Sequence, residues 1–406
     1  MPAPDYGIVL GKMYIKLREI SRKIEEYVTL IFSSLISSIR YRRRDLNSAD
    51  IRRIVIIKLD HIGDLILSIP AVANLRAHFP QAHIAMVVSS ASEQVARYIP
   101  YVDEVLCYDA RFFDRSGDSK AFDFARGMRF AREMRDRDFD LIVDLRGSFA
   151  SLLFALIARS KYRIDRGTYL IQRKLGKISP ESEHEAEVSL DILAQAGLPI
   201  RSRRMSMSLS EVDIDSAHLL LRKAGEVSSL CPIAVIHPGV PSALKSWSIE
   251  KYVQLADRLM QDYNAQIVLV GGKGEEQVAQ SIISLMNGEA INLSGQTTLG
   301  QLAAVLQKAD LFVGSDSGPM HLAAAYGTKV IGLYGPTSPQ RFGPYGDRCL
   351  ALRMESDCPP CMKGECKRRG YKCIDRISVD NVMEAVKQIW YNTNKVIEPS
   401  GKGGAR

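Results

Sequence analysis

The segment IVIIKLDHIGD, residues 54–64, joins a run of β-branched residues to a polar turn and the start of a helix. Apolar side chains from Ile54 to Leu59, interrupted only by Lys58, predict a strand buried on both faces. Gly63 permits a tight turn, and the amphipathic pattern from Asp64 to His78 predicts a helix. A buried strand followed by a helix is the repeating unit of a parallel sheet, so this segment indicates an α/β fold.

The same alternation continues along the chain and restarts once. We expect further strands at 84–88, 141–143, 233–236, 267–270, 290–293, 311–313 and 330–333, and helices near 122–137, 213–225, 249–261, 275–286, 299–308, 320–326 and 379–390. The polar, basic segment 159–184 is predicted to be loop-like. The pattern therefore predicts two doubly wound domains, with a ligand in the cleft at the carboxyl ends of their strands.

Length and composition agree with two globular domains, since the 406 residues are 46% hydrophobic and 25% charged. We divide the chain into a basic amphipathic extension (1–50), a first Rossmann-like domain (51–212), a linker (213–230), a second Rossmann-like domain (231–392) and a flexible tail (393–406). The segment 111–129 resembles an insertion.

Charge and the N-terminal pattern point to an anionic partner. The formal net charge is +8. Apolar residues recur at helical spacing just before a group of arginines; they are Val28, Ile31, Phe32, Leu35, Ile36 and Ile39, followed by Arg40, Arg42, Arg43 and Arg44. Such a helix either lies in an anionic membrane interface or packs on the protein's own body or a partner. With no signal peptide and no membrane-spanning run, we expect a cytoplasmic protein, peripheral on the inner face of the membrane.

Two strand ends in the sequence carry candidate chemistry. In the loop with Lys58, Asp60, His61 and Gly63, the carboxylate of Asp64 is either a helix N-cap or a general base facing the cleft. The loop from His237 to Ser248 follows a later strand and contains Ser242 and Lys245. A cation and several donors suit a diphosphate, although a loop with one lysine is also ordinary surface. Ser248 is expected to cap the next helix.

Two further turns lie in the same half of the chain. The glycine-rich turn 271–276 places Glu275 where a carboxylate could accept from ribose hydroxyls. The segment DSGPMH, residues 316–321, joins a strand to a helix with proline in its first turn; it contains Asp316, Ser317, Gly318, Met320 and His321. The free amides and partial positive charge of that helix end favour a phosphate.

These four segments, in this order, resemble the lipopolysaccharide heptosyltransferase family, glycosyltransferase family 9. The resemblance covers roughly residues 54–390, and the motifs at 316–322, 335–337 and 343–346 carry most of it. It implies a GT-B fold, an ADP-heptose donor held by the second domain, a lipopolysaccharide core acceptor held by the first, and no metal in catalysis. The family's base aspartate falls on Asp64 and its phosphate-binding lysine on Lys245.

The resemblance also places the family's helix-end phosphate loop on Asp316, Ser317, Gly318, Met320 and His321, and its ribose-side acid on Glu275. With His237, Ser242 and Lys245 from the loop after the earlier strand, these residues are the expected donor contacts. The predicted reaction is inverting transfer of a heptose or related sugar to a cell-envelope glycan. The alternatives are a GT-B nucleotide-sugar enzyme such as an epimerase, and a non-catalytic, membrane-docked glycan-binding scaffold. A nucleic-acid partner is not expected, because the basic residues do not interleave with aromatic ones.

Four of the seven cysteines, Cys358, Cys361, Cys366 and Cys373, fall within sixteen residues. A segment so short and polar has little core of its own, and four thiolates can surround a zinc ion tetrahedrally. We expect a structural zinc site here, with an iron–sulfur cluster or plain buried thiols as the alternatives.

Overall fold

The structure, a computed structural model, describes residues 46, 50–109, 124–148, 151, 154, 157–177, 182–224, 231–239, 242–354, 360, 361, 366 and 372–391, with backbone alone at 124–126, 223 and 224. The amphipathic stretch 28–44, the tail 393–406, Cys358 and most of the expected insertion lie outside the described residues. Among the described helices, none is long and apolar enough to cross a membrane.

The first domain is built on a five-stranded parallel sheet with the order β3-β2-β1-β4-β5. Its strands are β1 (Arg53–Lys58), β2 (His83–Val88), β3 (Glu104–Cys107), β4 (Leu141–Asp144) and β5 (Tyr162–Asp165). Residues 54–57 of β1 are buried, as expected of a central strand covered on both faces. The predicted opening strand is therefore confirmed.

The helices of this domain differ from the prediction in two places. They are α2 (Ile62–Ile66), α3 (Ile69–His78), α4 (Glu93–Arg97), α5 (Phe124–Asp136), α7 (Arg166–Lys174) and α8 (Glu185–Gln195). The single helix expected over 64–78 is two helices, because Pro70 lacks the amide that would continue the first. The segment 159–184 is not simply a loop: it contains β5 and α7, whose start is capped by Asp165 through the Thr168 amide.

The second domain contains a six-stranded parallel sheet with the order β11-β10-β9-β6-β7-β8. Its strands are β6 (Ile233–His237), β7 (Gln266–Leu269), β8 (Ala290–Asn292), β9 (Leu311–Ser315), β10 (Lys329–Leu333) and β11 (Cys349–Leu352). Its helices are α10 (Ile249–Tyr263), α11 (Glu276–Leu285), α12 (Leu299–Lys308), α13 (Gly318–Ala325), α14 (Pro339–Phe342) and α15 (Val379–Tyr391). Ser248 caps α10 through the Lys251 amide, as predicted.

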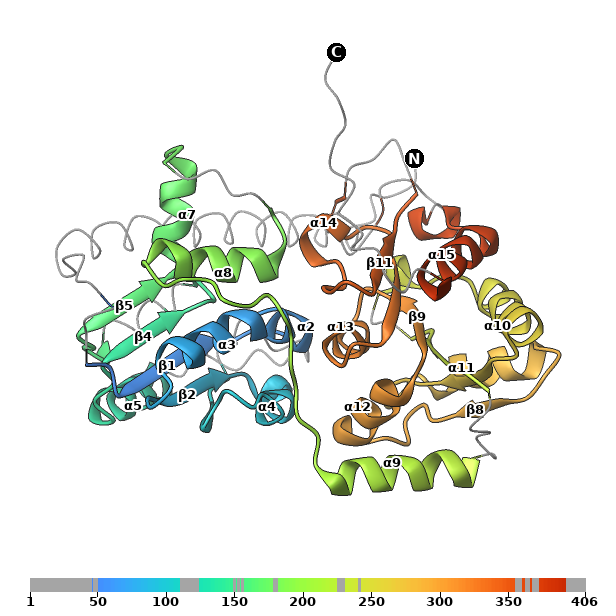
Figure 1. The fold of residues 1–406 in the computed structure, drawn as a ribbon, viewed down its shortest axis with the longest axis horizontal. Helices are drawn as coiled ribbons and strands as arrows, with labels where there is room; N and C mark the ends of the chain where they lie inside the picture. Colours follow the sequence, from blue (N-terminus) through green and yellow to red (C-terminus); the bar gives the residue numbers. More distant parts are fainter. Residues whose placement is uncertain are drawn as a thin grey trace, which may run out of the picture.

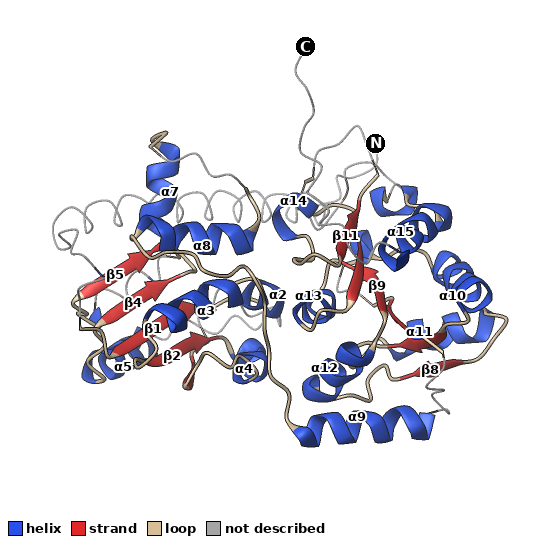
Figure 2. Cartoon of the chain, in the orientation of Figure 1, coloured by secondary structure: helices blue, strands red, loops and turns tan. Residues whose placement is uncertain are grey.

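The two sheets lie at opposite ends of the long axis, and α2 meets α13 between them (Figure 1). Helix α9 (Glu211–Ala224), which follows the first domain in sequence, runs along the second domain below α12 (Figure 2). An apolar core continues across the boundary, from Ile66 in α2 to Met320 and Leu322 in α13. This packing brings the carboxyl end of β1 close to the carboxyl end of β9.

Candidate functional site

The carboxyl end of β1 holds a buried ion pair. Lys58 and Asp60 are 3% and 4% exposed, and the Lys58 Nζ lies 3.1 Å from an Asp60 carboxylate oxygen. Arg146, just beyond β4, donates to the other Asp60 oxygen. Lys58 and Asp60, two of the four predicted acceptor-side residues, thus form a buried charge network with Arg146. The third, His61, is exposed and stands at the N-cap position of α2.

Asp64 lies in the first turn of α2, two residues after the start of the helix. It is therefore not the N-cap that spacing alone would suggest. Burial raises the pKa of its carboxyl, and the charges of Asp60 and Glu185 raise it further, while Lys58 and His321 lower it. Both domains contribute to this electrostatic environment, since His321 belongs to α13. A carboxylate with a raised pKa is better suited to accept a proton near neutral pH than an ordinary aspartate.

On the second domain, the predicted cation lies against the predicted carboxylate. The Lys245 Nζ donates to Asp316 Oδ2 at 2.6 Å, joining the loop after β6 to the turn after β9. Contacts with Lys245 and His321 hold the pKa of Asp316 at about 2 despite its burial. Ser242 stands at the head of the same 3-10 turn, where its carbonyl accepts from the Lys245 amide at 2.9 Å. The two loops thus converge on one charged site.

A second cluster adjoins this pair. Glu275 Oε2 lies 3.2 Å from His237 Nε2 and accepts from the Gly272 amide at 2.7 Å. On its other side, His237 Nδ1 lies 3.2 Å from the Ser317 hydroxyl. The neighbouring Glu276 instead accepts from the Gly274 amide, so Glu275 is the acid that joins the cluster. The structure thus brings the second, third and fourth sequence segments together.

The start of α13 forms the contact with the first domain. A Cβ added at Gly63 would lie 2.8 Å from His321 Cδ2, so the imidazole packs on the backbone next to Asp64. Gly318 faces Ile62 in the same way. Met320 is fully buried, and its sulfur accepts from the Tyr334 hydroxyl at 3.5 Å. The Met320 side chain thus packs in the core of the second domain, and the donor contact expected at Met320 stays a prediction for its backbone at the start of α13.

Sequence reasoning missed a group of polar residues at the same boundary. Glu185, the first residue of α8, is 5% exposed and pairs with Arg166 of the first domain and Arg341 of the second. His184 and Glu187 also contact the second domain, through Gly343 and Tyr345. The 343–346 motif is visible in the sequence, but its partners His184 and Glu187 lie in a segment without a motif, so no local signal links the two.

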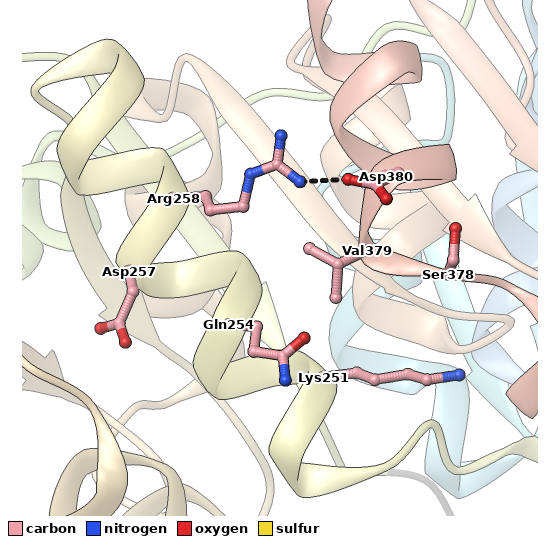
Figure 3. A pocket seen from close by; sticks show the side chains of 7 residues that line it. All are labelled: Lys251, Gln254, Asp257, Arg258, Ser378, Val379 and Asp380. Carbon is pink, nitrogen blue, oxygen red and sulfur yellow. Dashed lines mark hydrogen bonds and ion pairs between the residues drawn. The ribbon is translucent and has the colours of Figure 1, made fainter.

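A groove of about 410 Å³ lies elsewhere, between α10 and the start of α15 (Figure 3). It is lined by Lys251, Gln254, Asp257, Arg258, Ser378, Val379 and Asp380. Arg258 donates to Asp380 across it, and the Lys251 ammonium donates to the Ile377 carbonyl at 3.0 Å. None of the predicted site residues lines this groove.

Three of the four clustered cysteines are described, and all three are free thiols. Burial raises the pKa of the Cys373 thiol, and the neighbouring thiols of Cys361 and Cys366 raise it further, whereas Arg353 lowers it. Within the described residues, no group of three or more His, Cys, Asp or Glu side chains has the arrangement of a metal site.

Comparison with known proteins finds similar chains among the enzymes of sugar transfer. A family model described as glycosyltransferase family 9 (heptosyltransferase) matches residues 127–372, more than half of the chain. The lipooligosaccharide heptosyltransferase 2 of Campylobacter jejuni is 22% identical over 82% of this chain and 97% of its own length.

Two solved structures share the fold. A family 9 glycosyl transferase from Veillonella parvula has a TM-score of 0.73 and 24% identity, covering 85% of this chain and 99% of its own. The ADP-heptose lipopolysaccharide heptosyltransferase II of Escherichia coli has a TM-score of 0.62 and 23% identity, covering 83% and 98%.

Proposed function

This chain belongs to glycosyltransferase family 9, the heptosyltransferases, and we propose that it transfers a heptose from ADP-heptose to a lipopolysaccharide core or a related cell-envelope glycan. The family membership makes it a glycosyltransferase, which favours transfer over the epimerase and scaffold alternatives. One observation carries the assignment of roles: Asp64 in α2 stands beside His321 of α13, which in turn stands beside the Lys245–Asp316 pair. The proposed base in the first domain and the proposed diphosphate site in the second domain therefore lie on either side of His321.

In this mechanism Asp64 is the general base. The acceptor hydroxyl attacks the anomeric carbon of the heptose from the face opposite the diphosphate, and its proton passes to the Asp64 carboxylate. A new carbon–oxygen bond forms as the bond to the ADP oxygen breaks, which inverts the anomeric configuration. The raised pKa of Asp64 makes this carboxylate a stronger base than an exposed aspartate.

The second domain stabilises the leaving group. Lys245, held by Asp316 in the structure, would turn its ammonium toward the diphosphate, and the free amides at the start of α13 would donate to the same phosphate oxygens. Negative charge grows on the departing ADP in the transition state. These groups therefore stabilise the transition state more than they stabilise the bound donor. We assign the ribose hydroxyls to Glu275, with His237 and Ser317 holding the loop behind it. No catalytic metal is needed in this scheme, because Lys245 and the helix amides offset the charge.

We also propose a structural metal, zinc in the first instance, at Cys358, Cys361, Cys366 and Cys373. The short sequence spacing of the four cysteines supports it, because four thiolates can surround a zinc ion, and Arg353 lowers the pKa of the Cys373 thiol against the effect of burial. The fourth ligand, Cys358, lies outside the described residues. Zinc and iron content measured on protein purified without chelator tests this directly, and less than about one-tenth equivalent of either metal would contradict it.

For location, we propose that the N-terminal stretch 28–44 holds the enzyme on the cytoplasmic face of an anionic membrane. Its apolar stripe and four arginines support this, because such a helix gains both from burying apolar area and from attraction to anionic lipid headgroups. A lipid-linked acceptor would then be within reach.

Incubating the purified protein with ADP-heptose and truncated lipopolysaccharide acceptors tests the proposed activity. We expect release of ADP together with an acceptor that has gained the mass of one heptose. Release of ADP or of a free altered sugar without acceptor would favour the nucleotide-sugar alternative, and absence of both would favour the scaffold.

A further inference from the structure

The imidazole of His237 joins two loops of the second domain. His237 is the last residue of β6, which lies between β7 and β9 in the sheet, and it is only 3% exposed. Its Nε2 lies 3.2 Å from Glu275 Oε2, in the turn after β7, and its Nδ1 lies 3.2 Å from the Ser317 hydroxyl, in the turn after β9. The ring therefore connects the carboxylate to which we assign the ribose with the start of α13, where we place the phosphates.

The contact with Glu275 determines which ring nitrogen carries hydrogen. The hydrogen bond from His237 lowers the pKa of Glu275 against the effect of burial, and the Gly272 amide, which donates at 2.7 Å, lowers it as well. An ionised carboxylate can only accept hydrogen bonds, so Nε2 must be the donor. The carboxylate lies directly over Gly239 and Gly271, where an added Cβ would overlap it, so only glycine leaves room for this position.

The contact with Ser317 follows from this assignment. With hydrogen on Nε2, a neutral imidazole has only a lone pair at Nδ1, so the Ser317 hydroxyl must donate to it. Ser317 stands at the N-cap of α13, where a serine side chain ordinarily accepts from an amide of the first turn, yet it makes no such bond. The helix amides therefore stay free for a phosphate, but the serine oxygen beside them offers only lone pairs.

A phosphate bound at this helix end would be mismatched with Ser317. The diphosphate oxygens of a nucleotide sugar are ionised and only accept, so neither group could donate to the other. Turning the hydroxyl toward the phosphate would leave the buried Nδ1 of His237 without a partner, which is unfavourable. A proton on Nδ1 removes both problems, because Nδ1–H donates to the serine oxygen and the serine hydrogen is released for a phosphate oxygen.

We propose that His237 is a positioning residue that takes up one proton from solvent when the donor diphosphate binds, and so turns the Ser317 hydroxyl from His237 toward a phosphate oxygen. Glu275 keeps its hydrogen bond to Nε2 throughout and offsets the charge of the imidazolium. Donor binding is thereby linked to pH through this Glu275–His237–Ser317 relay. The inference rests on the proposed diphosphate site at the start of α13.

The other charged groups near the relay come from the same loops. Lys245, from the loop after β6, and Asp316, from the turn after β9, bind each other at 2.6 Å. His321 of α13 lies beyond them, with Nε2 3.8 Å from Asp316 Oδ1. Among the described residues, Glu275 is the charged group in contact with the His237 ring. His321 is thus the other histidine near this site whose protonation could respond to the donor, and the variants below separate the two.

Calorimetry of ADP-heptose binding to the full-length wild type, without acceptor, tests the proposal. Titrations at about pH 8, above the usual range of a free histidine, in two buffers of different ionisation enthalpy give the number of protons bound with the donor. ADP-heptose is the probe because both of its phosphates are esterified, whereas a terminal phosphate ionises near pH ~6 and would exchange protons of its own. We expect uptake of up to about one proton, and a Kd that rises with pH by up to about tenfold per unit.

Two variants and a control assign the proton. Ser317→Ala keeps the backbone amides but removes the relayed hydroxyl, and His237→Gln cannot bind the proton, so both should lose most of the uptake. Ser294→Ala is the matched control, since it also removes a buried serine hydroxyl, but in the loop after β8 and without a described contact to His237. Its proton uptake should equal that of the wild type. A merely structural role for Ser317 would weaken donor binding at every pH alike and leave the proton count unchanged.

Equal binding enthalpies in the two buffers, for a wild type that does bind ADP-heptose, would overturn the relay and leave the proposed function standing. Undiminished uptake in Ser317→Ala would also overturn it, because another group such as His321 would then take the proton. This result decides the matter even if His237→Gln fails to fold. A wild type that does not bind ADP-heptose would refute the donor assignment, and the relay with it.

Discussion

Replacing Gly63 with alanine should impair catalysis without destabilising the first domain. A Cβ at this position would lie 2.8 Å from His321 Cδ2, well inside ordinary van der Waals contact. His321 is 3% exposed and cannot swing away freely. Overpacking of this kind costs about 1–3 kcal/mol. Because the clash joins α2 to α13, the strain acts on the contact between the domains, while alanine within α2 is a better helix former than glycine.

We therefore expect kcat/KM to fall by roughly 5- to 150-fold, the range that corresponds to this energy. Affinity for ADP, measured by calorimetry, should stay within about twofold, because Lys245 and Glu275, to which we assign the diphosphate and the ribose, lie in other loops of the second domain. Gly288→Ala is a matched control: its Cβ would also lie 2.8 Å from a neighbour, but that neighbour is the flexible end of Met260.

A double-mutant cycle with His321→Ala isolates the contact. In the His321→Ala background, adding Gly63→Ala should cost little, because the obstacle has gone. Near-normal kcat/KM in Gly63→Ala alone would refute the reasoning, since His321 would then not pack on Gly63 in the active conformation.

Three other changes test separate parts of the account. Lys245→Ala should weaken ADP-heptose binding and lower kcat, because the diphosphate loses its cation; unchanged affinity and kinetics would count against the assignment. Activity should survive EDTA in a rapid assay, and a loss that magnesium or manganese specifically restores would show that a metal is needed. Changing Arg40, Arg42, Arg43 and Arg44 together to glutamate should reduce co-sedimentation with anionic vesicles but not with neutral ones, whereas equal co-sedimentation would make 28–44 a protein-packing segment.

Much of the fold was predictable because its strands are short, continuous apolar runs between turn residues. The strand at Ile54 and the turn after Ser315 show this, since periodicity and glycine placement define both locally. The segment 159–184 was harder, because β5 is a four-residue edge strand and α7 is largely polar. The apolar pattern runs through the break before α3 without interruption. Only Pro70, which lacks a backbone N–H, marks the end of the first helix in the sequence.

Some of the site residues could likewise be predicted from the sequence, and others could not. Lys245, Glu275 and Asp316 follow strands in recognisable turns, and parallel sheets bring such strand ends together. Glu185 and Arg341 are 156 residues apart and meet only because the two domains pack against each other. Such a contact leaves no local pattern in a single sequence. The burial of Met320 was equally invisible, because a methionine in a helix's first turn can face either the ligand or the core.

The most direct test of the account is transfer of heptose from ADP-heptose to a truncated lipopolysaccharide acceptor, with Asp64→Asn beside the wild type. The substitution keeps the size of the side chain and removes the base. We predict heptosylated acceptor of inverted anomeric configuration from the wild type. The variant should bind ADP normally but lose on the order of a hundredfold or more in kcat, as expected when a general base is removed. A folded Asp64→Asn protein that transfers heptose at a near-normal rate would contradict the central claim.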